Sequence, residues 1–297
     1  AALAVARIMK LPFITTYHTA IPQYAMHLTD DLSIEELMWS GILWFYDQSD
    51  FIFSPSLATA QELTDRGIPK EKIQIMPRGV DIERFNPDNE WTGDDLPEGT
   101  RFLYVGRVSK EKNLPLLCRA FKRLSETHSD VHLIVVGDGP YLKEMKRSMN
   151  GSSVRFTGYL DGDELAGIYP ACDAFVFPST TDTFGNVVLE AQASGVPIIV
   201  TDMGGPQENL IPDETGMIVK GEDENALVEA MKAMATNSER RRQMGVRARQ
   251  YAETRSFLKS FDAYWEIYRE RSDTSKARDF TPLPNYIPIP EAQTVVA

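Results

Sequence analysis

The chain has 297 residues, enough for two domains of ordinary size, each with its own hydrophobic core. Its formal net charge of −12 argues against a nucleic-acid partner, because an acidic surface repels a phosphate backbone. No apolar run approaches the roughly 18 residues that a membrane-spanning helix needs. The cysteines, Cys118 and Cys172, lie in apolar surroundings, which favours a reduced, cytoplasmic setting over a disulfide framework.

Strand-like and helix-like segments alternate through the first part of the chain. The opening, from Ala1 to Arg7, looks like the middle of a helix, so we expect the chain to begin inside a domain. The alternation predicts βα units on a parallel sheet, and we expect residues 1–80 to form a truncated doubly wound domain. Its expected elements are strands over 13–17, 50–54 and 72–76 and helices over 34–48 and 57–66.

A break follows at residues 81–100, which are rich in Asp, Asn, Pro and Gly and have no apolar period. This composition predicts an interdomain linker. A complete doubly wound domain is expected over 101–255, and residues 256–297 are expected to form a helix that packs back on the first domain, then an irregular, proline-rich tail from Arg278. The expected strands of this second half are 101–105, 131–136, 154–157, 173–177, 198–200 and 217–219, and the expected helices are 114–125, 141–149, 163–169, 187–194, 224–235 and 256–271.

Two cations follow the first strand of the second domain. Arg107 comes directly after the strand end, and Lys112 precedes Asn113, which is predicted to cap the next helix. Ligands of open parallel sheets bind beyond the carboxyl ends of the strands, so both cations are expected at the mouth of that crevice. A guanidinium and an ammonium suit a diphosphate, one as a bidentate fork and one as a point charge. A solvated loop with ordinary surface cations is the alternative, and this segment alone leaves both open.

A second polar segment joins the strand over 173–177 to the helix over 187–194. The helix start near Gly185 offers free backbone N–H groups and the positive end of a dipole, which suit a pyrophosphate. Asp182 lies before the helix and Glu190 about one turn into it, so both carboxylates can face one ligand and accept bonds from sugar hydroxyls. The apolar neighbours of Glu190 predict that this acid is partly buried. A buried carboxyl group needs hydrogen-bonding or charged partners, because without them its pKa rises. The alternative makes Asp182 a helix cap and Glu190 a solvated helix position.

A third candidate is His18, in the segment Tyr17-His18-Thr19 directly after the first predicted strand. At a strand end of a two-domain enzyme this side chain can face the cleft. A lone histidine is more often structural, and spacing alone favours that interpretation.

The motifs together resemble the retaining glycosyltransferases of family 4. The resemblance rests on Gly106-Arg107-(x)4-Lys112, on Asp182-x-Phe184-Gly185-(x)4-Glu190-Ala-x-Ala-x-Gly-x-Pro, and on Gly204-Gly205-Pro206-x-Glu208. Tyr17-His18-Thr19 looks like the family's first-domain segment with an active-site histidine, and residues 76–81 look like its interdomain junction. The match covers nearly the whole chain and implies the GT-B fold of two Rossmann-like domains.

The resemblance also implies an activity, which is transfer of a hexose from a nucleotide-diphosphate sugar to an acceptor hydroxyl, with retention and without a metal. Arg107 and Lys112 would bind the diphosphate, Glu190 the ribose hydroxyls and Asp182 the hexose, with His18 touching the sugar from the opposite domain. Further donor-binding residues would be Gly106, Phe184, Gly185, Asn186 and Val187. No cofactor is expected besides the nucleotide-sugar co-substrate, and the acceptor is expected to be a carbohydrate or a lipid-linked molecule.

Two positions depart from the family pattern. Asp182 stands where Glu is usual, so the hexose contact is expected to shift. Arg78 stands where Asn is common and adds a cation, which leads to the hypothesis of an anionic acceptor.

Two other classes of protein remain as alternatives. A non-catalytic sugar-nucleotide binder would fit a whole donor domain beside a shortened partner, and a structural α/β module would make the charged residues surface features. The paired cation and carboxylate motifs argue against the structural module. We expect a cytoplasmic protein, with contact to the inner face of a membrane through the missing part as the alternative.

Overall fold

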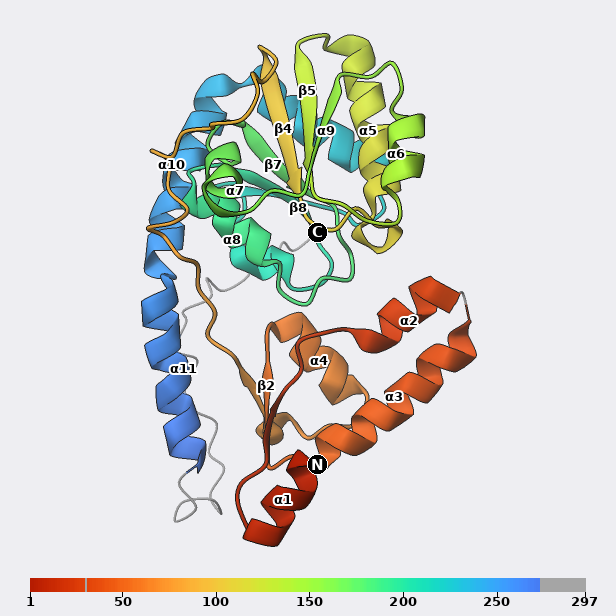
Figure 1. The fold of residues 1–297 in the computed structure, drawn as a ribbon, viewed down its shortest axis with the longest axis vertical. Helices are drawn as coiled ribbons and strands as arrows, with labels where there is room; N and C mark the ends of the chain where they lie inside the picture. The colour runs from red at the N-terminus through yellow and green to blue at the C-terminus, as the bar shows by residue number, and fades with distance from the viewer. Residues whose placement is uncertain (30, 273–297) are drawn as a thin grey trace, which may run out of the picture.

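The computed structural model describes residues 1–29 and 31–272, so the predicted proline-rich tail lies outside the described residues. Two separate sheets form, one of three strands in the order β1-β2-β3 and one of six in the order β6-β5-β4-β7-β8-β9. Every strand pairing in both sheets is parallel, which confirms the predicted α/β class. Figure 1 shows the two sheets as separate bodies with their helices around them. No helix in the described ranges is long and apolar enough to cross a bilayer.

The small sheet has its central strand β2 (Phe51–Ser54) between β1 (Ile14–Thr16) and β3 (Ile73–Ile75). All of β2 is buried, as expected for the middle strand of a covered parallel sheet. The helices of this part are α1 (Ala2–Met9), α2 (Ile21–Thr29), α3 (Leu32–Asp47) and α4 (Leu57–Asp65). The sequence prediction missed α2, in which Pro22 is the second residue. Proline is tolerated there because the first-turn N–H groups have no partner within a helix.

The large sheet has β4 and β7 side by side at its centre, with β5 and β6 on one side and β8 and β9 on the other. The winding direction therefore reverses between β4 and β7, and open parallel sheets bind ligands beyond the strand ends at such a point. The strands are β4 (Thr100–Val105), β5 (Val131–Val136), β6 (Val154–Gly158), β7 (Ala174–Phe177), β8 (Ile198–Thr201) and β9 (Gly216–Val219). The helices are α5 (Leu114–Thr127), α6 (Leu142–Ser148), α7 (Gly162–Ile168), α8 (Asn186–Ala193), α9 (Glu224–Thr236) and α10 (Ser238–Thr254).

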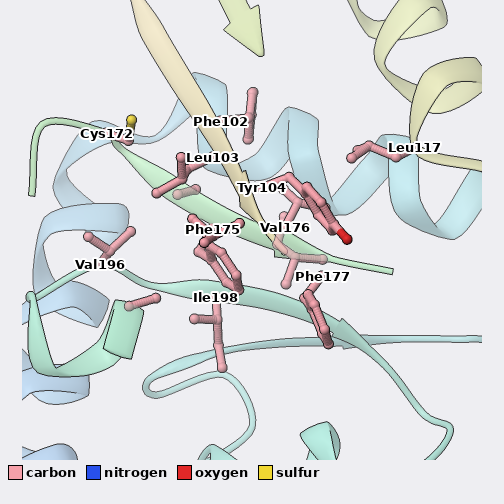
Figure 2. Close-up of a cluster of buried hydrophobic side chains, with 14 of the residues drawn as sticks. Phe102, Leu103, Tyr104, Leu117, Cys172, Phe175, Val176, Phe177, Val196 and Ile198 are labelled. Carbon is pink, nitrogen blue, oxygen red and sulfur yellow. The ribbon is translucent and has the colours of Figure 1, made fainter. Parts of the chain in front are cut away.

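The hydrophobic core of the large sheet centres on β4 and β7. Figure 2 shows aromatic side chains from both strands within one cluster. The rings of Phe175 and Phe177 stack at 6.0 Å between centroids, and Tyr104 stacks on Phe177 at 6.1 Å. Cys118 and Cys172 are both buried free thiols. This packing holds the two strand ends that carry the predicted site residues.

The helix α10 was also missed by the sequence prediction. Its sequence is strongly polar, and only small faces of it are apolar, with Met244, Ala248 and Ala252 buried. Ion pairs one turn apart, Arg242 with Glu239 and Arg249 with Glu253, support the exposed side. The apolar period that reveals most helices is therefore weak here.

The segment 81–99 contains no helix or strand, yet it packs closely on the large sheet. Phe85 is buried with its ring 5.7 Å from that of Tyr169, and Trp91 packs against the same core. The division of the chain at residues 80 and 100 stays a prediction, but this packing attaches the intervening segment to the second half.

Two neighbouring segments connect the halves of the chain: residues 78–80 are the outward passage and residues 255–257 the return passage. Together they are here called the hinge. In the outward passage the Val80 N–H donates to the Arg255 carbonyl at 3.0 Å, and in the return passage the Phe257 N–H donates to the Val80 carbonyl at 2.8 Å. A side chain at Gly79 would place its Cβ 2.5 Å from the Arg255 oxygen, so only glycine fits this approach. The two passages therefore fix each other's backbone.

Beyond the hinge, α11 (Phe257–Ser272) runs back along the small sheet (Figure 1). The Tyr264 ring lies 4.7 Å from the ring of Phe53, and Ile267 is buried in one cluster with Phe51 and Phe53. The other face of α11 carries Phe261 and Trp265, which stack on each other and are about half exposed. The last described helix is thus part of the core of the first described sheet.

Candidate functional site

A cavity of about 440 Å³, here called the cleft cavity, lies beyond the carboxyl ends of β4 and β7 and reaches the end of β1. The loops after these strands supply its walls, as the reversal of winding between β4 and β7 predicts. It brings together most of the site residues predicted from the sequence, namely His18, Gly106, Arg107, Lys112, Asp182, Gly185, Asn186 and Val187. Residues from both halves of the chain therefore face one space.

Lys112 and Asp182 form a close ion pair within this cavity. The Lys112 Nζ lies 2.5 Å from the Asp182 Oδ2, and each side chain is only about one fifth exposed, at 22% and 21%. Asn113 is the N-cap residue of α5, as predicted, but its side chain does not cap the helix. This residue adopts a left-handed conformation with φ of 54° and makes no capping bond, because asparagine tolerates that conformation where the turn of Lys110–Lys112 meets α5.

The loop that carries Arg107 is anchored by the strand before it. The Tyr104 hydroxyl donates to the Arg107 carbonyl at 2.8 Å. Burial raises the pKa of Tyr104 well above its usual value, and the nearby charges of Asp182 and Glu111 raise it further, so the hydroxyl stays protonated and remains a donor. The Arg107 side chain lines the cleft cavity from this fixed point.

The start of α8 forms another wall of the cleft cavity. Gly185 precedes the helix with φ of 78°, a left-handed conformation that favours glycine. Asn186 and Val187, the first residues of α8, line the cavity, and first-turn N–H groups have no partner within a helix. The cavity therefore joins a helix N-terminus to two cations, an arrangement suited to an anion.

Glu190 lies one turn further along α8 and lines a separate cavity of about 480 Å³, here called the hinge cavity, together with Arg78. The Tyr169 hydroxyl donates to the Glu190 Oε2 at 2.7 Å. Burial raises the pKa of Glu190, and the bond from Tyr169 opposes that shift. The partly buried acid expected from the sequence is present, but its partner was missed. Asn186 lines both cavities, so it lies where they meet.

Phe184 supports the site from inside the core. Its ring is 6% exposed, and its carbonyl accepts a bond from the Asn209 Nδ2 at 2.6 Å. The Arg78 guanidinium lies over this ring at 4.6 Å. Phe184 lines neither the cleft cavity nor the hinge cavity, which separates it from the other predicted donor-binding residues.

His18 is tied to the second half of the chain through its backbone. The Thr183 Oγ1 donates to the His18 carbonyl at 2.7 Å. Burial lowers the pKa of His18, and the positive charge of Arg78 lowers it further. The imidazole is therefore neutral at pH 7 and is available as a hydrogen-bonding group rather than as a cation.

A third cavity, of about 650 Å³, adjoins the cleft cavity and is here called the α4 cavity. Asp182 lines both. The first half of the chain supplies polar side chains that include Gln61, Glu62, Asp65 and Arg66. This space is thus rich in hydrogen-bonding groups and touches the predicted hexose residue.

Comparison with known proteins decides the family. Residues 94–251 match the family model described as "Glycosyl transferases group 1", and residues 1–84 match "Glycosyltransferase Family 4". The chain belongs to the group 1 glycosyl transferases. This confirms the resemblance drawn from the motifs.

The curated relatives of this glycosyl transferase chain are longer than the chain itself. It is 32% identical to the sulfoquinovosyl transferase of Arabidopsis thaliana over 85% of this chain and 50% of that protein. It is also 32% identical to a GDP-mannose-dependent alpha-mannosyltransferase of Mycobacterium tuberculosis over 77% of this chain and 59% of that protein. The chain therefore spans only about half the length of these relatives.

Solved structures share the fold of this glycosyl transferase chain. Sucrose-phosphate synthase from Thermosynechococcus elongatus superposes with a TM-score of 0.74 at 24% identity, over 86% of this chain and 67% of that one. The Anabaena protein Alr3699/HepE, in complex with UDP and glucose, superposes with a TM-score of 0.74 at 17% identity, over 91% and 74%. The similarity confirms the GT-B fold that the sequence predicted.

Glu208 of the glycosyl transferase makes a contact between the two halves that the motif alone did not explain. Its carboxylate accepts bonds from the N–H groups of Leu57 at 2.7 Å and Ala58 at 2.8 Å, the first residues of α4. Burial raises the pKa of Glu208, while these bonds and Arg255 lower it. A negative charge at a helix N-terminus is favourable, so this contact holds the halves together.

Glu208→Ala is expected to lower the free energy of unfolding by about 2 kcal/mol, because the N–H groups of Leu57 and Ala58 lose the carboxylate that accepts from them. For a chain of this size we expect the Tm to fall by about 5 °C, and the radius of gyration to rise as the halves separate. Calorimetry and small-angle scattering measure both. Glu214→Ala, at an exposed position of the same half, is the control, and equal values for the two variants would contradict the role.

Proposed function

We propose that the protein transfers a hexose from a nucleotide-diphosphate sugar to an acceptor hydroxyl, with retention of anomeric configuration and without a metal. The observation that carries the proposal is the cleft cavity, where Arg107, Lys112 and the start of α8 surround one space with Asp182 and His18. Two cations and a helix N-terminus suit a diphosphate. The adjacent carboxylate and imidazole suit a sugar.

The names of relatives support a nucleotide-sugar donor. The mannosyltransferase of Mycobacterium tuberculosis is GDP-mannose-dependent, and the Anabaena protein was solved with UDP-glucose. Their identities to this chain leave the base and the sugar open. The cavities fit a donor that extends from Glu190, through Asn186, to Asp182, with ribose, diphosphate and hexose in that order.

In the proposed reaction the bond between the anomeric carbon and the phosphate oxygen breaks, and the acceptor hydroxyl attacks from the same face. The acceptor's proton passes to the departing phosphate oxygen, so no side chain is needed as a nucleophile. Arg107 and Lys112 stabilise the charge that develops on the leaving diphosphate. Lys112 also pairs with Asp182, so the cation proposed for the diphosphate and the carboxylate proposed for the hexose hold each other in place.

For the acceptor, we propose the α4 cavity, since Asp182 lines both this space and the cleft cavity. Its amides and carboxylates, from Gln23, Gln61 and Glu62, suit the hydroxyl groups of a carbohydrate or of a lipid-linked sugar.

The proposal is tested by a thermal-shift screen against UDP, GDP, ADP and their common sugar conjugates, each with and without EDTA. A donor that raises the Tm of the wild type by several degrees but not that of Glu190→Ala supports the site and identifies the nucleotide. Transfer of sugar, followed by NMR at the anomeric position, then tests retention. No shift with any nucleotide would contradict donor binding, and loss of the shift in EDTA would contradict metal independence.

A non-catalytic sugar-nucleotide binder is the second candidate, because the residues proposed for the diphosphate and the ribose, Arg107, Lys112 and Glu190, all lie in the second half of the chain. The two candidates differ in one measurement. An enzyme consumes the donor in the presence of acceptors, whereas a binder gives the thermal shift with no turnover.

A further inference from the structure

Arg78 lies in the hinge, and its backbone position is fixed by its neighbours. It precedes Gly79, which packs against the Arg255 carbonyl, and Val80, which is hydrogen-bonded to both Arg255 and Phe257. The side chain therefore starts from a point that both chain passages hold in place.

Among the described residues, the guanidinium of Arg78 has a stacking partner but no polar one. It lies 4.6 Å from the centre of the Phe184 ring, and burial lowers its pKa. With the residues in 1–29 and 31–272 it forms no hydrogen bond and no ion pair. A half-buried cation without an anion is unfavourable, and a ligand anion would relieve that cost.

Two other arginines that stack on rings show the contrast. Arg66 lies over Trp39 and pairs with Glu36 at 3.6 Å. Arg255 lies over the ring of Tyr251 and donates to the Asn209 Oδ1 at 3.0 Å. Stacking on a ring thus does not prevent polar contacts in this protein, and Arg78 differs from these two because it has no polar partner among the described residues.

The cavity that Arg78 faces is the hinge cavity, which it shares with Asn186 and Glu190. Asn186 also lines the cleft cavity, with Arg107 and Lys112. Arg78 therefore approaches the start of α8 from the hinge side, while the other two cations approach it from the side of β4. Its effect on His18, which lines the cleft cavity, agrees with a position near the junction of the two spaces.

We propose that Arg78 binds the diphosphate of the donor from the hinge side, as a third cation at the start of α8. This inference rests on the proposed function. A guanidinium suits phosphate oxygens because its N–H groups form a planar fork. The anionic-acceptor hypothesis is disfavoured, since Arg78 lines the hinge cavity with Glu190 and not the α4 cavity.

The test compares uridine, UMP and UDP on the wild type, Arg78→Gln and Arg78→Lys by titration calorimetry, and repeats the series with guanosine nucleotides if the screen selects GDP. Arg78→Gln is expected to weaken the diphosphate about 10-fold or more and to leave the nucleoside within about 2-fold. Arg78→Lys is expected to recover part of the loss, because the charge remains without the fork. Arg242→Gln, at an exposed arginine of α10 that lines none of the three cavities, is the control and should bind UDP as the wild type does.

Each other outcome has a distinct meaning. Equal losses for uridine and UDP, together with a lower Tm, would make Arg78 a structural residue and overturn the proposal. Unchanged UDP binding, with transfer to glycerol 3-phosphate reduced relative to glycerol, would place the anion on the acceptor and also overturn it. Binding of UDP to the wild type and to Arg78→Gln with equal affinity would overturn the role of Arg78 and leave the proposed function intact. Absence of nucleotide binding by the wild type would overturn both.

Discussion

Arg107→Ala is expected to lower kcat by about 100- to 1,000-fold, because the guanidinium stabilises charge that develops on the leaving diphosphate only in the transition state. Lys112→Ala should reduce turnover as well, and it also leaves Asp182 without its partner at 2.5 Å. Two rates are measured: the turnover of donor with acceptor present, and the slow hydrolysis of donor with no acceptor. A fall in kcat larger than the rise in KM is the expected pattern for a group that acts in the transition state.

Lys110 provides a control for Arg107 within the same loop. Its side chain is 64% exposed, and its ammonium pairs with Glu144 at 3.0 Å, away from the cleft cavity. Lys110→Ala should therefore keep wild-type turnover. A wild-type kcat in Arg107→Ala, with a folded protein, would refute the role assigned to the cation.

Glu190→Gln is expected to weaken binding of the nucleoside diphosphate by about 10- to 100-fold. The carboxylate accepts two bonds from ribose hydroxyls in the proposed complex, and an amide replaces a charged acceptor with a neutral one. Titration of the diphosphate into both proteins measures the loss. Glu229→Gln on the exposed face of α9, where the carboxylate is 71% exposed, is the control. Equal affinities for wild type and Glu190→Gln would contradict ribose binding at this residue.

Glu190→Gln should raise the stability of the folded protein at neutral pH, although it weakens nucleotide binding. Burial raises the pKa of Glu190, so the folded protein holds this proton more tightly than the unfolded chain, whose carboxyl titrates near 4.5. Above that pH the ionised, buried carboxylate costs stability, and the cost grows until the folded group is fully ionised. Glu190→Gln removes it. We expect the variant to melt above the wild type at pH 8 and the difference to shrink near pH 4, and a pH-independent difference would contradict the assignment.

The alternating β and α segments of the sequence predicted most of the fold because buried parallel strands such as β5 and β7 are nearly continuous apolar runs. They also placed the candidate site, since Arg107 and Asp182 follow strands whose carboxyl ends meet at one edge. The helix α10 was missed because its polar sequence has little apolar period, and α2 because its first turn contains proline.

Other features depend on contacts that no local pattern encodes. The Tyr169 hydroxyl, at the end of α7, donates a hydrogen bond to Glu190 in α8. Glu208, in the second half of the chain, accepts a hydrogen bond from the start of α4 in the first half. The position of Arg78 over Phe184 depends on how the hinge lies against the larger sheet. Buried polar groups require partners, which indicates that such contacts exist, but only the tertiary structure identifies them.

The packing of α11 on the small sheet has a consequence for the order of synthesis. Ile267 completes a cluster with Phe51 and Phe53, so the core of the small sheet needs a side chain that leaves the ribosome long after β2 does. Domains usually fold from the N-terminus during translation. Here the larger sheet can finish first, while β1, β2 and β3 wait with an apolar face uncovered. During that interval the apolar face is open to non-native contacts, so the release of α11 from the ribosome decides when this half of the chain can finish folding.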